Sequence, residues 1–154
     1  MKTLADLRPL VLAPVLLLCS ASPASPPSAK IPLQPITDQL PARYTLPIDV
    51  VIKSARDYRL LFGHDAKGVD FAQEWVVLYS AGSVSVLSSA SIGEVRMTEG
   101  GNAMEVITLL SQDPCSPLFV AQPAYAMVKM PAQDPAPALV RFLHMFATTE
   151  CLPD

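Results

Sequence analysis

The stretch EWVVLYSAG, from Glu74 to Gly82, decides the fold of this chain. Its apolar side chains alternate between the two faces of an extended backbone, with Trp75, Val77 and Tyr79 on one face and Val76 and Leu78 on the other. A strand that is apolar on both faces needs cover on both sides. The segment therefore predicts a central strand between two layers.

Further strands are predicted downstream of this segment. SVSVLSSASIGEVRM and AMEVITLL are separated by TEGGN, in which Gly100, Gly101 and Asn102 tolerate the positive φ angles of tight turns. The two segments therefore predict a hairpin. AYAMVKM, at Ala124–Met130, predicts another strand, because a proline bounds it on each side.

A strand and a helix are predicted upstream. IDVVIK, at Ile48–Lys53, is rich in β-branched residues and follows a proline. The helix begins after Ser54, a capping residue with Asp57 in a capping-box-like position, and Gly63 can close it. Its apolar face holds Tyr58, Leu61 and Phe62.

The last segment, LVRFLHMF, fits both strand alternation and helical spacing. We favour a strand, because Pro137 precedes it and Thr148 and Thr149 follow it. The sum is an α+β domain, with one short helix packed on a mostly antiparallel β-sheet that could curl toward a barrel.

The N-terminus predicts export. Lys2 and Arg8, the apolar run Pro9–Leu18 and the small residues of CSASPAS form the three parts of a secretory signal, with cleavage after Ala21 or Ala24. The predicted organisation is a signal peptide at 1–24, a proline-rich linker at 25–47 and the α+β domain at 48–154. The mature protein is expected in the periplasm, in the cell envelope or outside the cell.

Cys19 leaves two alternatives open. Lipidation of this cysteine would anchor the chain, but Leu17 and Leu18 stand where lipoprotein signals carry a small residue, so we favour simple cleavage. An uncleaved anchor is the other alternative. Membrane association is expected only if Cys19 is lipidated.

The charge balance excludes a basic binding surface. Cleavage after Ala24 removes Lys2, Arg8 and Asp6, so the net charge moves from −3 to −4. A mildly acidic chain has no electrostatic footprint for nucleic acid, so no nucleic-acid partner is expected.

Cys115 and Cys151 are the two cysteines that remain after cleavage. An even pair in an exported chain predicts a disulfide, and closing the loop between them would stabilise the fold by about 3–4 kcal/mol. A nucleophilic Cys115 would need His64 or His144 as its base, and no cysteine-hydrolase signature surrounds it. We therefore expect no catalytic residue.

Metal and cofactor binding find little support. The histidines and cysteines lack the spacing of a compact ligand set, so no metal or cofactor is expected. The loop HDAKGVD places His64, Asp65 and Asp70 together, which leaves a weak cation site open. We expect instead that the two aspartates bond to loop backbone groups.

The serine-rich segment is the predicted partner-binding strand. It contains no Gly-x-Ser-x-Gly motif, so nothing in the sequence indicates that one of its serines is a catalytic nucleophile. An edge strand with small side chains can accept an extended chain by β-augmentation. Its serines are Ser83, Ser85, Ser88, Ser89 and Ser91.

The order of these segments resembles a known family. Three segments, with a cysteine before the last of them, are similar to the C-terminal domain of the PrcB-like family. This family comprises protease-complex-associated proteins and is found among exported bacterial proteins and lipoproteins. The segments are, in order, IDVVIKSARDYRLLFG, VDFAQEWVVLYSAG and LFVAQPAYAMVKMP. The resemblance covers Ile48–Pro131. The residues that carry it are Phe62, Gly63, Asp70, Phe71, Gln122, Pro123, Tyr125, Val128, Lys129 and Pro131.

The resemblance implies an accessory domain without catalysis, which associates with an extracytoplasmic protease and stabilises or modulates it. The family's Thr-Gly-Gly-Tyr segment is replaced here by SVSVLSSASI, so the choice of partner is not carried over. Two other classes stay open. One is a small hydrolase or thiol enzyme that uses Cys115 or a serine with His64 or His144, and the other is a lipid-anchored module of the cell envelope.

Overall fold

The computed structural model describes residues 29–151. The predicted signal peptide, both cleavage sites and Cys19 lie outside the described residues. The elements are β1 (Gln34–Pro35), β2 (Ile48–Ile52), α1 (Ala55–Phe62), β3 (Glu74–Met97), the 3-10 turn η1 (Glu99–Gly101), β4 (Ala103–Pro131) and β5 (Leu139–Thr148). Within the described part, no helix is long and apolar enough to cross a membrane.

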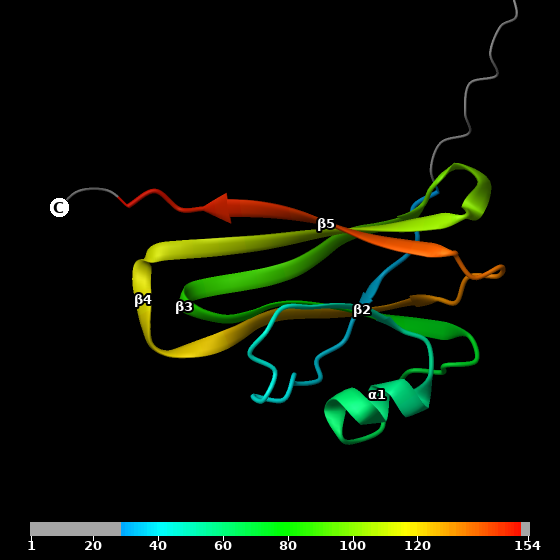
Figure 1. Cartoon of the computed structure of the whole chain (residues 1–154), viewed down its shortest axis with the longest axis horizontal. Helices are drawn as coiled ribbons and strands as arrows, with labels where there is room; N and C mark the ends of the chain where they lie inside the picture. The colour runs from blue at the N-terminus through cyan, green and yellow to red at the C-terminus, as the bar shows by residue number, and fades with distance from the viewer. Residues whose placement is uncertain (1–28, 152–154) are drawn as a thin grey trace, which may run out of the picture.

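Strands β3 and β4 form one long antiparallel ribbon that folds back on itself (Figure 1). One leg pairs Glu74–Ser80 with Tyr125–Pro131 and lies next to α1; the other pairs Leu87–Met97 with Met104–Asp113. We call these the helix-side layer and the far layer. The separate strands that the sequence predicts, before and after Gly82 and on both sides of Cys115, are therefore legs of two continuous strands.

The central strand has cover on both faces, as predicted. Trp75, Val77 and Tyr79 are buried between the two layers, where they meet residues of the far layer such as Val95 and Val106. Val76 and Leu78 are fully buried on the opposite face, against Tyr58 and Phe62 of α1. Two apolar cores thus share one strand, and the order of layers is helix, sheet, sheet (Figure 1).

The predicted helix is confirmed with its caps. The backbone N–H of Asp57 donates to Ser54 Oγ at 3.1 Å, and Ser54 Oγ donates in turn to the Asp57 carboxylate at 2.7 Å. Gly63 takes the left-handed conformation at φ 82° and its N–H donates to the Arg59 carbonyl. The predicted hairpin is confirmed as well, since η1 joins β3 to β4.

The last segment is a strand, as favoured over a helix, but it pairs with β4 in parallel. The chain leaves β4 in the helix-side layer and returns to the start of that same strand, where the N–H of Ala138 donates to the Asn102 carbonyl. Strand β5 therefore runs in the direction of the first leg of β4. The sheet is mostly antiparallel, with this one parallel pair.

The sheet curls but does not close. On one side, residues 30–36 link the two layers, because Lys30 pairs with Arg96 and Gln34 with Lys129. Ile31 and Leu33 pack on the core between the layers, and Ile36 packs on the core under α1. On the other side, β2 and β5 do not pair with each other. We call the gap between these two strands the seam.

Candidate functional site

The disulfide predicted between Cys115 and Cys151 is present, with 2.02 Å between the two Sγ atoms. Strand β5 pairs with β4 in a constant register from Ala103–Leu139 to Gln112–Thr148, and the N–H of Thr149 donates to the Gln112 carbonyl beyond it. The cysteines continue this register by three residues. Neither sulfur is a free thiol in this state, which leaves no nucleophile or metal ligand at Cys115.

The serine-rich segment lies in the far-layer leg of β3, just after the bend. Its residues pair with β4 along one edge, for example Ser89 with Ser111 and Ser91 with Leu109. Along the other edge, no described residue pairs with the backbone between Val84 and Glu94. The predicted edge strand is therefore an edge strand in this structure.

The outward backbone groups of this edge follow from the register. The Gln112 carbonyl is taken from the β5 side by Thr149, so Gln112 faces away from β3. Ser88 lies opposite Gln112. In an antiparallel ladder, both members of such a pair point their N–H and C=O groups away from each other. The backbone groups of Ser88, and by alternation those of Ala90, therefore point to the open edge.

The composition of this edge leaves it unprotected against pairing. From Ser83 to Gly93 there is no charged residue and no proline, which are the two residue types that most often block edge strands. By contrast, β2 carries Asp49, β1 contains Pro35, and β5 carries Arg141. The serine side chains stay small: Ser83, Ser85, Ser89 and Ser91 are exposed, while Ser88 is half-buried and donates to the Val86 carbonyl at 3.0 Å.

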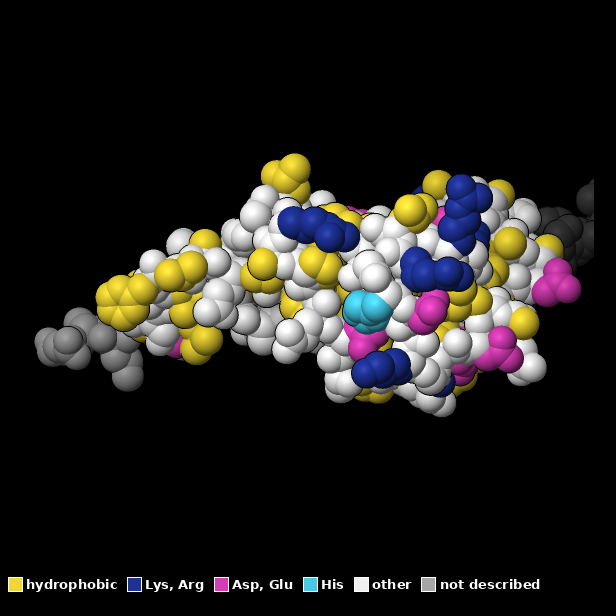
Figure 2. Space-filling view, turned by 90° about the horizontal axis from the view of Figure 1, so that it is seen from below, with side chains coloured by type: hydrophobic (Ala, Val, Ile, Leu, Met, Phe, Trp, Pro, Cys, Tyr) yellow, Lys and Arg dark blue, Asp and Glu magenta, His cyan; other side chains and the backbone are white. Residues whose placement is uncertain are grey.

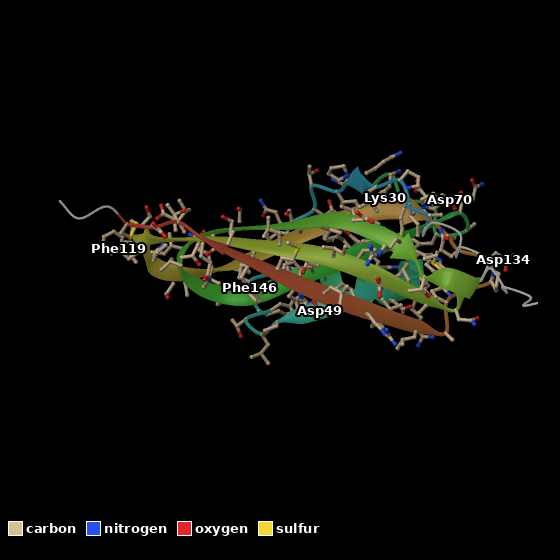
Figure 3. The ribbon with its side chains drawn as sticks, turned by 90° about the horizontal axis from the view of Figure 1, so that it is seen from above. Lys30, Asp49, Asp70, Phe119, Asp134 and Phe146 are labelled. Carbon is tan, nitrogen blue, oxygen red and sulfur yellow. A yellow bond between two sulfur atoms is a disulfide. The ribbon has the colours of Figure 1, made fainter. Side chains whose placement is uncertain are left out.

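Apolar side chains gather at the narrow end of the molecule, next to the bend and the disulfide (Figure 2). Phe119 is fully exposed there and marks the end of the molecule opposite Asp134 (Figure 3). Val120 and Leu87 are also exposed. An extended chain on the β3 edge would run toward this apolar end.

The loop after α1 does not assemble a cation site. Asp65 forms an ion pair with Arg59 at 2.9 Å, so the predicted backbone role is wrong for this carboxylate. Asp70 does take that role, because its Oδ1 accepts from the N–H of Ala72 at 3.0 Å. His64 Nδ1 lies 3.0 Å from the Asp65 carbonyl. Nowhere in residues 29–151 do three or more His, Cys, Asp or Glu side chains form a group able to hold a metal ion.

His144 lies at the seam and is held at both ring nitrogens. Its Nε2 is 3.0 Å from Asp49 Oδ2 on β2, and its Nδ1 is 2.8 Å from Thr108 Oγ1 on β4. The Tyr79 ring stacks on the imidazole with 5.3 Å between centroids. Burial, and then the Asp49 charge, raise the pKa of Tyr79, against an opposing hydrogen bond with Thr108.

The sequence did not reveal this cluster, because its members come from four strands. It has the residue types of a catalytic triad, but Thr108 is completely buried, so its hydroxyl cannot meet a substrate. None of the five serines of the serine-rich segment bonds to His144. The hypothesis of a serine paired with His144 therefore gains no support from the geometry.

Hollows near charged groups include one beside Glu74 and one at the seam. A shallow one of about 580 Å³ is lined by Gly68, Asp70, Gln73, Glu74 and Pro131, next to the ion pair of Glu74 with Lys129 at 2.9 Å. The hydrogen bond from Lys129, and then that from the Asp70 N–H, lower the pKa of Glu74. The second, of about 240 Å³, lies at the seam and is mostly apolar.

Comparison with known proteins finds no matching family model, no matching curated protein and no matching solved structure. The resemblance to the PrcB-like family therefore stays a prediction. Residues 29–151 define a mostly antiparallel β-domain that contains one α-helix, one disulfide and an open strand edge.

Proposed function

We propose that this protein is a non-enzymatic, exported binding module, which captures an extended segment of another protein on the open edge of β3. The observation that carries the proposal is the open outer edge of β3 between Val84 and Glu94, along a segment with neither charge nor proline from Ser83 to Gly93. An added strand would satisfy the outward groups of Ser88 and Ala90.

The rest of the site supports binding over catalysis. The Cys115 sulfur is tied to Cys151, and the imidazole of His144 is tied to Asp49 and to the buried Thr108. A nucleophile and its base must reach each other and the substrate. No such pair assembles among the described residues, and we propose no cofactor.

The partner that we propose is an extracytoplasmic protease, which the module would stabilise or modulate. This part rests on the resemblance of Ile48–Pro131 to accessory domains of protease complexes. The serine-rich edge replaces the family's Thr-Gly-Gly-Tyr segment, so the partner would be read by main-chain bonding and by small pockets between serines.

The experiment is affinity capture from the envelope fraction with the purified protein, followed by Ser88→Pro. Proline removes the outward N–H of Ser88 and leaves the bonds between β3 and β4 in place, because an edge position tolerates proline. Ser88→Ala is the matched control, since it removes the hydroxyl and keeps the N–H. We expect capture to fall at least tenfold for Ser88→Pro and to be unchanged for Ser88→Ala.

A second variant covers a folding failure of Ser88→Pro. Ser89→Lys places a charge on the exposed face of the same strand and should also weaken capture, because lysine on an edge disfavours strand addition. Hydrogen exchange should show that amides from Ser88 to Ile92 gain protection when the captured protein is bound. Equal capture by folded Ser88→Pro and Ser89→Lys would refute the proposal.

A further inference from the structure

The seam between β2 and β5 contains a cavity that the proposed function does not use. Its volume is about 240 Å³, and Asp49 of β2 and Phe146 of β5 both line it. Figure 3 shows these two residues close together along β5. From this geometry we propose that the seam cavity binds a small aromatic amine, with the ring in the cavity and the ammonium group at Asp49.

The walls of the cavity suit a single ring. Ala81, Leu110 and the Tyr79 ring supply apolar lining, and the apolar part of the lining exceeds the polar part. Drug-sized ligands occupy cavities of roughly 300–1,000 Å³, so a hollow below that range takes a smaller molecule. One ring with a short side chain is the ligand size that fits.

Phe146 forms an incomplete wall at the mouth. It lines the cavity, yet its side chain is 71% exposed. A planar ring placed between Phe146 and the inner wall would bury apolar surface on both partners, and aromatic pairs gain further from offset or edge-to-face contact. An aromatic occupant would therefore gain more from Phe146 than a polar one.

Asp49 supplies a polar anchor with an acceptor to spare. Its Oδ2 is bonded to His144 Nε2, whereas no described residue donates to Oδ1. The carboxylate is about one-third exposed, at 34%, so a ligand can reach it from solvent. Among the other polar groups of the lining, the imidazole of His144 is bonded at both nitrogens, and the buried hydroxyl of Ser80 already accepts from the Gly82 N–H at 3.1 Å.

The charge of the residues that line the cavity favours a positively charged ligand. Asp49 is the one carboxylate that lines the cavity, and the lining contains no lysine or arginine. An ammonium group near this carboxylate is attracted and a carboxylate of the same size is repelled, which is how a site rejects a close analogue.

The test titrates the purified protein with phenethylamine and, separately, with phenylpropionate, a ring acid of similar length. Amide chemical shifts report where each compound binds. We expect saturable shifts at Asp49, at Tyr79–Ala81 and at His144–Phe146 with the amine, and an affinity at least tenfold weaker for the acid. No saturable shift at these positions, or equal affinity for amine and acid, would overturn the proposal.

Two variants test the roles of ring and charge. Phe146→Ala should weaken amine binding at least tenfold, while Leu139→Ala should leave it unchanged, because Leu139 is an exposed apolar residue on the opposite face of the same strand. Asp49→Asn should bring amine and acid to within about threefold of each other. Equal loss in Phe146→Ala and Leu139→Ala would also contradict a ring site at the seam, and none of these results depends on the β3 edge.

Discussion

At the scale of single residues, Tyr58 is a titratable side chain that is fully removed from water. The ring is completely buried under the sheet, and the hydroxyl donates a short hydrogen bond to the Asp38 carboxylate. Burial, and then the bond to Asp38, raise the pKa of Tyr58 far above its ordinary value of 10.0. The phenol thus stays protonated in the folded protein at pH values where an unfolded chain ionises.

This shift predicts a loss of stability in alkali. Above about pH 10 the unfolded chain loses the tyrosine proton while folded Tyr58 keeps it, so the unfolded state binds fewer protons and the free energy of unfolding falls as pH rises. The raised pKa of Tyr79 acts in the same direction. Urea unfolding between pH 8 and 11 measures the effect, and Tyr58→Phe should make the fall shallower.

At neutral pH, Tyr58→Phe should itself destabilise the fold by about 1–2 kcal/mol, since it leaves the half-buried Asp38 carboxylate without its donor. Tyr44→Phe is the matched control, because the Tyr44 hydroxyl has only a contact of 3.4 Å with exposed Arg43. A loss of equal size in both variants would contradict the assigned role of Asp38.

The opposite dependence is expected for Glu74. Its folded pKa lies below the ordinary value of 4.5, so the stabilisation from its ionised form is complete above that value and is lost as pH falls through the lowered pKa. Glu74→Gln should therefore be less stable than the wild-type protein at pH 7 and converge with it in acid. Urea midpoints at the two pH values measure this, with exposed Glu150→Gln as a control that changes neither.

At the scale of elements, the bend of β3 depends on Gly82. This glycine has φ at +78°, and a Cβ there would lie 2.7 Å from the Thr45 carbonyl oxygen. The close approach holds the loop before β2 against the bend, where the Ser83 N–H donates to that same carbonyl at 3.0 Å. The turn of the ribbon and the entry of β2 are thus fixed together.

Gly82→Ala should accordingly cost more than backbone strain alone. Gly68 has a similar φ of +70° with nothing within 4 Å of a built Cβ, so Gly68→Ala isolates the strain, at about 1 kcal/mol. We expect Gly82→Ala to lose a further 1–3 kcal/mol or so, because backbone atoms must move. Denaturant midpoints of the two variants measure the difference, and equal losses would show that the contact with Thr45 adds nothing.

The elements also show which features a sequence can predict. The helix follows from Ser54 and Gly63, and the hairpin from Gly100 and Gly101, because caps and turns are local chemistry. The double cover of Glu74–Gly82 follows from its pattern. The ribbon's continuity through Gly82 does not, since glycine equally predicts an end or a bend.

Contacts between residues far apart in the chain could not be predicted from the sequence. The parallel pairing of β5 and the bonds of His144 to Asp49 and Thr108 join segments with no local signal for one another. The same His144 appears in sequence as an unpartnered candidate base. For the disulfide, by contrast, the sequence is sufficient: once the predicted signal peptide is set aside, two cysteines remain and only one pairing is possible.

At the scale of the whole molecule, the disulfide fixes β5 to the far layer. It closes a loop of 36 residues, so Cys115→Ser with Cys151→Ser should lower the free energy of unfolding by about 3–4 kcal/mol in the chain-entropy estimate. Hydrogen exchange should show that amides of β5 lose protection before those of β2, since each strand pairs with one neighbour but only β5 leads into the disulfide. Reductant should weaken the wild-type protein and leave the double variant unchanged.

Residues 30–36, which link the two layers, also place the start of the described chain at one end of the molecule. The chain enters the described structure at Ala29, whose carbonyl accepts from Met97 beside the hairpin turn, whereas Phe119 and the disulfide occupy the far pole (Figures 1 and 3). A tether attached upstream of Ala29 would therefore hold the domain at the end opposite Phe119. The exposed apolar end and the serine-rich edge of β3 that leads to it would then face away from the point of attachment, where they are accessible to a partner.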